Sequence, residues 1–173
     1  MAEKVNENDI KTAEKIFEAL TALKDEGTLS DVIVSVKGKE FPCHRAQLAA
    51  VSGFFKKCLT TDMKEAREGK IELKDITEKT FSTLLACIYG GKYVLRKDNF
   101  FDIWTAADML DINFITAQCL DFLVENVSNI NYVGYLCKAR LLSEQGKQTR
   151  FAIYWRELFI VFYSSQDKFV GTG

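Results

Sequence analysis

The hydrophobic positions of the chain follow two different periods, and the change between them marks its first elements. From Asp9 onward, apolar residues recur every three or four positions (Ile10, Ala13, Phe17, Leu20 and Leu23), which predicts an amphipathic helix ending near Gly27. Within residues 31–52, alternating valines precede a Lys-Gly-Lys turn and a second short apolar run. Helical spacing then resumes at about His44, so this stretch predicts a β-hairpin that leads into a helix.

The same reasoning assigns the chain as far as residue 126. Ser52 and Thr77 stand where they can cap the helices that follow them. The expected elements are helices over 45–50, 53–59, 78–89, 99–110 and 112–126, short strands over 71–73 and 93–95, and a polar surface loop over 60–70. A few short strands combined with many helices indicate an α+β class, with a small sheet capped by a cluster of helices and extra helices at the C-terminal end.

Residues 127–173 continue the helical pattern less regularly. Residues 149–163 carry apolar side chains on nearly every helical face, so this helix is expected to be buried. Arg156 and Glu157 interrupt its longest apolar run, which is too short to span a bilayer. Little chain remains to cover the helix over residues 149–163. We therefore expect residues 127–173 to form an incomplete helical pair, whose missing neighbours would bury that helix.

Composition narrows the class of function. The chain has 173 residues, enough for one domain with a small appendage, and a net charge of −1 with mixed signs, so it lacks the basic stripe expected of a nucleic-acid-binding protein. Its polar N-terminus has no apolar signal core. The five widely spaced cysteines form no CxxC pair, and there is one histidine. These features favour reduced thiols in a cytoplasmic or nuclear protein, with no metal site and no membrane segment.

A search for catalytic chemistry gives no positive result. His44 follows Cys43 directly, but adjacent residues at a strand-to-helix junction seldom converge, so a hydrogen-bonded structural histidine is the favoured interpretation. Asp31 is interpreted as a local hydrogen-bonding or partner-facing carboxylate. No phosphate-binding, nucleophile-elbow or metalloprotease motif occurs. The sequence therefore predicts a protein that is not an enzyme, with no catalytic residues and no cofactor.

Two features leave alternatives open on pattern alone. The stripe of the first helix can pack on its own domain or on a second subunit. Met63, the single large apolar residue within the polar stretch 60–70, can fold back on the body or serve as an adaptable anchor for a partner.

Several motifs together resemble the BTB/POZ domain. They are Asp31, Phe41-x-x-His44-Arg45-x-x-Leu48, Ser52-x-x-Phe55, Met63-Lys64-Glu65, Ile71-x-Leu73, Phe81-x-x-Leu84-Leu85, and Ala106-Ala107-Asp108-x-Leu110. The first helix resembles the dimerisation helix of the kelch-like branch. The resemblance covers residues 9–126, and residues 127–173 are similar to the start of a BACK region.

The resemblance implies a function. It implies a homodimer with Ile10, Ala13, Phe17 and Leu20 at the interface. It also implies an adaptor for cullin-3 ubiquitin ligases, since Met63-x-Glu65 fits the apolar-x-Glu contact motif of the family, and Leu110, Asp111 and Phe114 match a second contact region. Substrates of the ubiquitin conjugation pathway would bind through a module that is not in this chain. The alternative is a BTB dimerisation module of a transcription regulator or scaffold that recruits a corepressor and does not bind cullin.

Overall fold

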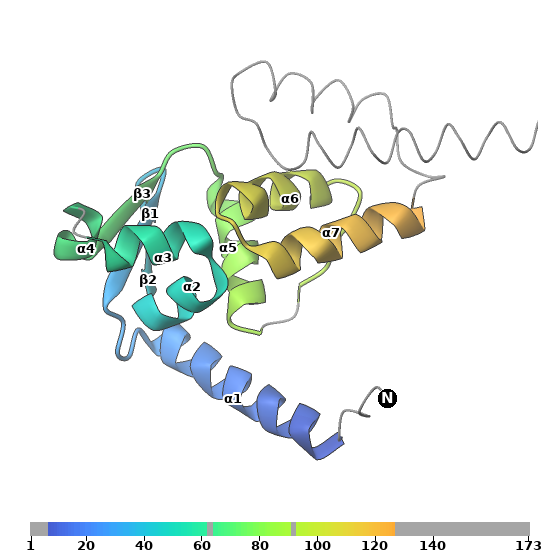
Figure 1. Ribbon diagram of the computed structural model, residues 1–173, viewed down its shortest axis with the longest axis horizontal. Coiled ribbons are helices and arrows are strands. Elements are labelled where there is room, and N and C mark those ends of the chain that lie inside the picture. The colour runs from blue at the N-terminus through green and yellow to red at the C-terminus, as the bar shows by residue number, and fades with distance from the viewer. Residues whose placement is uncertain (1–6, 62–63, 91–92, 127–173) are drawn as a thin grey trace, which may run out of the picture. The chain divides into compact units, whose positions relative to one another are not determined.

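The computed structural model describes residues 7–61, 64–90 and 93–126 (Figure 1). The described helices are α1 (Glu7–Glu26), α2 (Arg45–Val51), α3 (Gly53–Thr60), α4 (Lys64–Glu68), α5 (Glu78–Ile88), α6 (Phe100–Met109) and α7 (Asn113–Asn126). The strands are β1 (Val32–Val36), β2 (Lys39–Cys43) and β3 (Lys70–Leu73). The chain divides into two compact units, residues 1–119 and 120–173, and every described element belongs to the first unit except the second half of α7. The predicted α+β class is confirmed.

The sheet has the order β2-β1-β3. β2 pairs with β1 in the antiparallel sense through the two-residue turn Lys37-Gly38, whose φ angles of +49° and +91° suit a tight hairpin. β3 pairs with β1 in the parallel sense, so that Val34 lies opposite Ile71. The alternate residues Val32, Val34 and Val36 are all buried, which gives the sheet its core face.

Helices complete the core on one side of this sheet. α2 packs against α3 and α5, and α5 packs against α6. The largest fully buried side chains come mainly from α3, α5 and α6 and include Trp104, Phe55, Phe81 and Phe100. The aromatic side chains of these helices therefore fill the space that the small sheet leaves.

The residues predicted to cap or end helices lie at helix ends in the structure. The hydroxyl of Ser52 accepts a hydrogen bond from the backbone N–H of Phe55 at the start of α3, and Thr77 does the same for Thr80 at the start of α5. Gly27 ends α1 with a left-handed φ of +68°. Helix α1 begins at Glu7, two residues before the predicted start, so that Asn8 and Asp9 lie inside the helix.

Two assignments made from sequence were wrong. Part of the stretch predicted as a polar loop is the short helix α4, which has no buried side chain and so lacks the apolar stripe that would reveal it. The strand expected over residues 93–95 is not one, because residues 93–96 form no regular element and the described sheet holds only β1, β2 and β3. Among the described residues, no helix is both long and apolar enough to cross a membrane.

Candidate functional site

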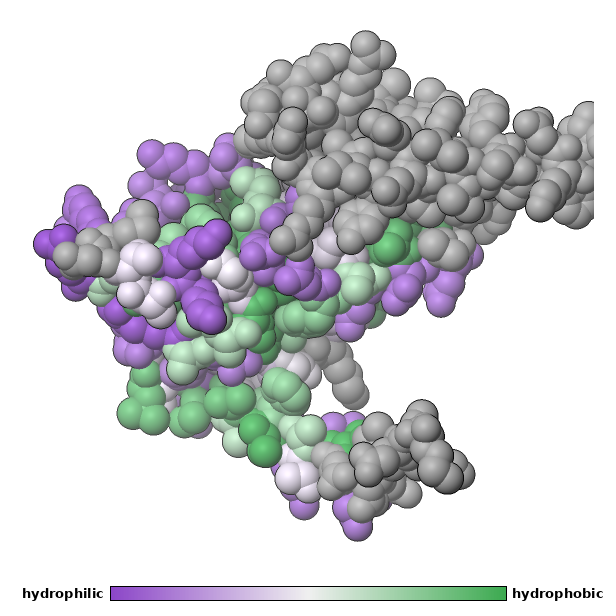
Figure 2. All heavy atoms as spheres, in the orientation of Figure 1, coloured by the Kyte–Doolittle hydropathy of each residue, from purple (hydrophilic) through white to green (hydrophobic). Residues whose placement is uncertain are grey.

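The first candidate surface is the outward side of α1. Ile10 is 48% exposed and Phe17 is 40% exposed, Ala13 is exposed, and Leu20 is half-buried. Ile16, which the sequence stripe omitted, is 55% exposed and widens the surface. Figure 2 shows hydrophobic side chains gathered along α1 and the turn after it. Exposed apolar residues grouped along one helix are typical of a protein-binding surface.

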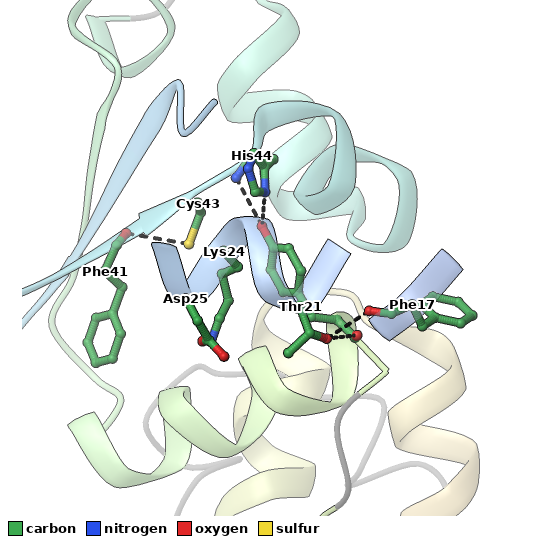
Figure 3. Close-up of polar contacts among 8 residues, drawn as sticks. Phe17, Thr21, Lys24, Asp25, Phe41, Cys43 and His44 are labelled. Carbon is green, nitrogen blue, oxygen red and sulfur yellow. Dashed lines mark hydrogen bonds and ion pairs between the residues drawn. The ribbon is translucent and has the colours of Figure 1, made fainter. Parts of the chain in front are cut away.

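The C-terminal half of α1 is fastened to the end of α5. The hydroxyl of Thr21 lies 2.7 Å from the carbonyl oxygen of Tyr89 and 2.8 Å from that of Phe17, one turn back in α1 (Figure 3). Phe17 covers Gly90 so closely that a Cβ added there would lie 2.6 Å from the Phe17 Cβ. Lys24 lies over the Tyr89 ring, with its Nζ 5.9 Å from the centroid. These contacts hold α1 at one end and leave Ile10 and Ala13 exposed.

His44, at the start of α2, extends this attachment to α2 (Figure 3). Its Nε2 lies 2.9 Å from the Thr28 carbonyl oxygen and its Nδ1 lies 2.9 Å from the Tyr89 hydroxyl. A carbonyl only accepts, so Nε2 of the neutral ring donates and the Tyr89 hydroxyl donates to Nδ1. The same hydroxyl accepts from the His44 backbone N–H at 3.0 Å. His44 therefore has the structural role predicted for it, with both ring nitrogens engaged.

The second candidate surface lies around α4. Glu65 is half-buried in the first turn of this helix, while its predicted companion Met63 lies outside the described residues. Glu65 and Lys64 border a cleft of about 600 Å³, whose other side is formed by α3 and β3. A smaller cleft of about 260 Å³ shares Phe54, Glu72 and Lys74 with it and reaches Met109 and Leu110. The surface near Glu65 is thus hollowed along β3 toward the end of α6.

The predicted second contact region divides between surface and core. Phe114 is 40% exposed, but Leu110 is only 2% exposed. A contact through the Leu110 side chain would require it to leave the core, so the predicted contact at Leu110 stays a prediction. Its carbonyl oxygen accepts a hydrogen bond from the Ser52 hydroxyl.

Asp111 fixes this turn against α3. It has a left-handed φ of +51°, and its carbonyl oxygen accepts the Gly53 N–H at 3.2 Å. Its carboxylate lies so close to Gly53 that any Cβ there would overlap it. Gly53 is the first residue of α3, and a carboxylate near the N-terminal end of a helix is favourable because the helix dipole is positive there. Asp111 is therefore held by α3 beside the exposed Phe114.

The described residues offer little for catalysis. Burial raises the pKa of the Cys43, Cys87 and Cys119 thiols to about 12, and it also raises the pKa of Cys58. Neutral thiols are poor nucleophiles. The Asp31 carboxylate accepts the Arg45 backbone N–H at 2.7 Å, the local role predicted for it. Over the described part of the chain, no group of three or more His, Cys, Asp or Glu side chains could hold a metal ion.

Curated relatives share this sequence pattern. Human Kelch-like protein 24 is 32% identical over 122 residues, which cover 70% of this chain and 20% of that protein. Human Kelch-like protein 6 is 31% identical over 165 residues, which cover 95% of this chain and 27% of that protein. The chain thus spans between 20% and 27% of the length of these relatives.

Solved structures share the fold. The BTB domain of human gigaxonin superposes with a TM-score of 0.59 at 25% identity, covering 71% of this chain and 98% of its own. The BTB domain of zebrafish PATZ1 gives 0.58 at 25% identity, covering 72% and 98%. The family model of the BTB/POZ domain matches residues 20–127. The chain therefore belongs to the BTB/POZ domain family.

Proposed function

We propose that this chain is a non-enzymatic, homodimeric adaptor that binds cullin-3 and brings substrates to a ubiquitin ligase. The observation that carries the proposal is the apolar-x-Glu sequence Met63-Lys64-Glu65, which stands in a BTB/POZ domain whose relatives include Kelch-like proteins. The position of Glu65 at the border of a cleft supports it. Met63 would supply an apolar knob, and Glu65 would stiffen its backbone.

Each subunit would contribute one cullin surface and one half of the dimer interface. The cullin surface comprises Met63, Glu65, Asp111 and Phe114, with Leu110 supporting the turn from below. The dimer interface comprises Ile10, Ala13, Phe17 and Leu20 on α1, where exposed apolar area supports an isologous contact. Residues 127–173, which lie outside the described residues, would act as a partial BACK-like extension. Substrates would bind a module outside this chain. The protein would act in the cytoplasm and also in the nucleus.

The deciding experiment is calorimetric titration with the purified N-terminal region of cullin-3. Wild-type protein should bind with nanomolar-to-micromolar affinity, and Met63→Ala combined with Glu65→Ala should weaken binding by at least about 30-fold, because truncating a central contact costs about 2 kcal/mol or more. Asp98→Ala, at an exposed acid before α6, is the control and should bind like the wild type.

Two outcomes contradict the proposal. Wild-type protein that does not bind cullin-3 would leave a BTB dimerisation module, and its partners would then be sought among corepressor-like proteins. Binding that survives the double substitution would place the cullin contact elsewhere on the domain.

A further inference from the structure

We propose that Arg45 is a positioning residue that holds α4, and with it Glu65, in place. Helix α4 has only five residues and no buried side chain. An isolated helix this short is unstable in water, so neither its own hydrogen bonds nor core packing accounts for a fixed position. Something outside the helix must therefore anchor it.

Arg45 supplies that anchor. Its Nη1 donates to the carbonyl oxygen of Ala66, in the middle of α4, at 2.9 Å. This bond is partly buried and has a charged donor, the kind of hydrogen bond that contributes most to stability. Gly69, which follows α4, lets the guanidinium approach, since a Cβ there would lie 3.2 Å from Nη2. The Ala66 carbonyl is thus joined to a residue at the start of α2.

Arg45 is itself held from the opposite side. Its Nε donates to the backbone carbonyl of Asp31 at 3.0 Å, and its backbone N–H donates to the Asp31 carboxylate at 2.7 Å. Asp31 directly precedes β1, the central strand of the sheet. The guanidinium therefore spans from a rigid strand to a short surface helix, and its planar fork of donors allows it to serve both at once.

The backbone on either side of this contact makes the attachment continuous. The Gly69 N–H donates to the Glu65 carbonyl at 3.0 Å, and the Gly69 carbonyl accepts from the Ile33 N–H at 2.8 Å. Glu65 and Ala66 thus have their carbonyls bound on two sides, one through Gly69 to β1 and one through Arg45 to the residue before β1. Removing the Arg45 contact leaves the Ala66 carbonyl without this bond, and α4 should then move more freely about its link through Gly69 to β1.

The importance of Arg45 for cullin-3 rests on the proposed function, but its hold on α4 does not, and the two are tested separately. Hydrogen–deuterium exchange in the free protein compares wild type with Arg45→Lys, which keeps the charge and the backbone bond to Asp31 but loses both guanidinium bonds. Amides over residues 65–69 should exchange about ten-fold faster or more, because a bond with a charged donor is lost. Arg96→Lys, the same change at an exposed arginine, should leave them unchanged.

The second arm measures cullin-3 binding in a double-mutant cycle. Arg45→Lys should weaken binding about ten-fold in the wild-type background and less than about two-fold in the Glu65→Ala background, because Arg45 acts through α4. Circular dichroism and the unfolding midpoint verify that the variants fold. Asp31→Asn, which keeps an acceptor for the Arg45 N–H, provides a milder second variant.

Each outcome decides the proposal. Unchanged exchange over residues 65–69 in Arg45→Lys overturns it, whatever happens to binding. Faster exchange with an equal loss of binding in both backgrounds overturns the link to Glu65. Wild-type protein that does not bind cullin-3 contradicts the proposed function, while faster exchange at α4 would still establish Arg45 as its anchor.

Discussion

At the scale of single residues, the Tyr89 hydroxyl joins three segments that are far apart in the sequence. It bonds both the backbone and the ring of His44, whose other ring nitrogen reaches Thr28. Tyr89 is fully buried, and burial raises its pKa to about 12, so the hydroxyl stays protonated and able to donate across the physiological range. This oxygen atom therefore links the end of α5 to the start of α2 and, through the His44 ring, to the turn after α1.

Tyr89→Phe removes only this atom, and we expect a clear loss of stability. The His44 backbone N–H and Nδ1 would both lose their partner, so the free energy of unfolding should fall by about 1–3 kcal/mol. Urea denaturation followed by circular dichroism measures the change. Tyr93→Phe is the control and should cost less, because its hydroxyl bonds Gln118 in an exposed contact and otherwise meets only the Cys87 thiol, a weak hydrogen-bonding group. Equal losses in the two variants would argue against the role given to Tyr89.

Residue roles that depend on near neighbours in the sequence could be predicted, and roles that depend on distant ones could not. Ser52 and Thr77 were identified as caps because a cap bonds within three residues of itself. His44 was expected to be hydrogen-bonded, but its partners Tyr89 and Thr28 are 45 and 16 residues away. The contact between Arg45 and Ala66 spans 21 residues and left no signal in either local pattern.

At the scale of elements, α1 is fixed at one end and exposes apolar side chains along the rest. Its stripe was predicted from helical spacing, but sequence alone could not decide which residues face the chain's own core. The structure divides them: Thr21 and Phe17 contact the end of α5, and Ile10 remains exposed. Helix α4 was not predicted, because its mostly charged residues show no helical spacing of apolar positions.

Charge placed on the α1 stripe should prevent dimerisation. Phe17→Asp combined with Leu20→Asp would bury two carboxylates in an apolar interface, which is costly unless they are paired. Sedimentation at low micromolar concentration should show monomers. Lys15→Asp makes the same charge change of −2 on an exposed side of the helix and should stay dimeric.

A variant at Ile10 tests the dimer interface without disturbing the contacts that hold α1 on its own subunit. Phe17 also packs on Gly90, so its replacement could loosen α1 from its own subunit. Ile10→Asp avoids this problem, because Ile10 is 48% exposed within the subunit. A dimer that persisted in both the double variant and Ile10→Asp would refute the assigned interface.

At the scale of the whole molecule, the buried thiols report on how the compact unit unfolds. Cys43, Cys58, Cys87 and Cys119 lie on β2, α3, α5 and α7, and all four are free and buried. A reduced, mostly buried state was predicted because the whole chain has five cysteines, an odd number, and four of them have apolar neighbours. The fifth, Cys137, lies outside the described residues.

Native protein in a Cys137→Ser background should therefore resist alkylation at pH 8. Burial keeps the pKa of Cys43, Cys87 and Cys119 near 12, so almost no thiolate is present to react. Labelling should rise at all four sites over one urea transition, as mass spectrometry of peptides would show. Stability should also fall between pH 9 and pH 12, because unfolded thiols ionise near 9.0 while the folded ones do not. Rapid labelling of Cys43 in native protein would contradict its burial.

The close approach of Gly53 and Asp111 has a consequence for how this sequence can vary over evolution. No side chain fits at position 53 while Asp111 keeps its left-handed backbone and its carboxylate against α3. A larger residue at position 53 therefore requires the Asp111 carboxylate to rotate away from α3, a shorter residue at position 111, or a turn of different shape. The two positions, 58 residues apart, are therefore coupled, and a change at one of them is expected to alter the side chain or the turn at the other.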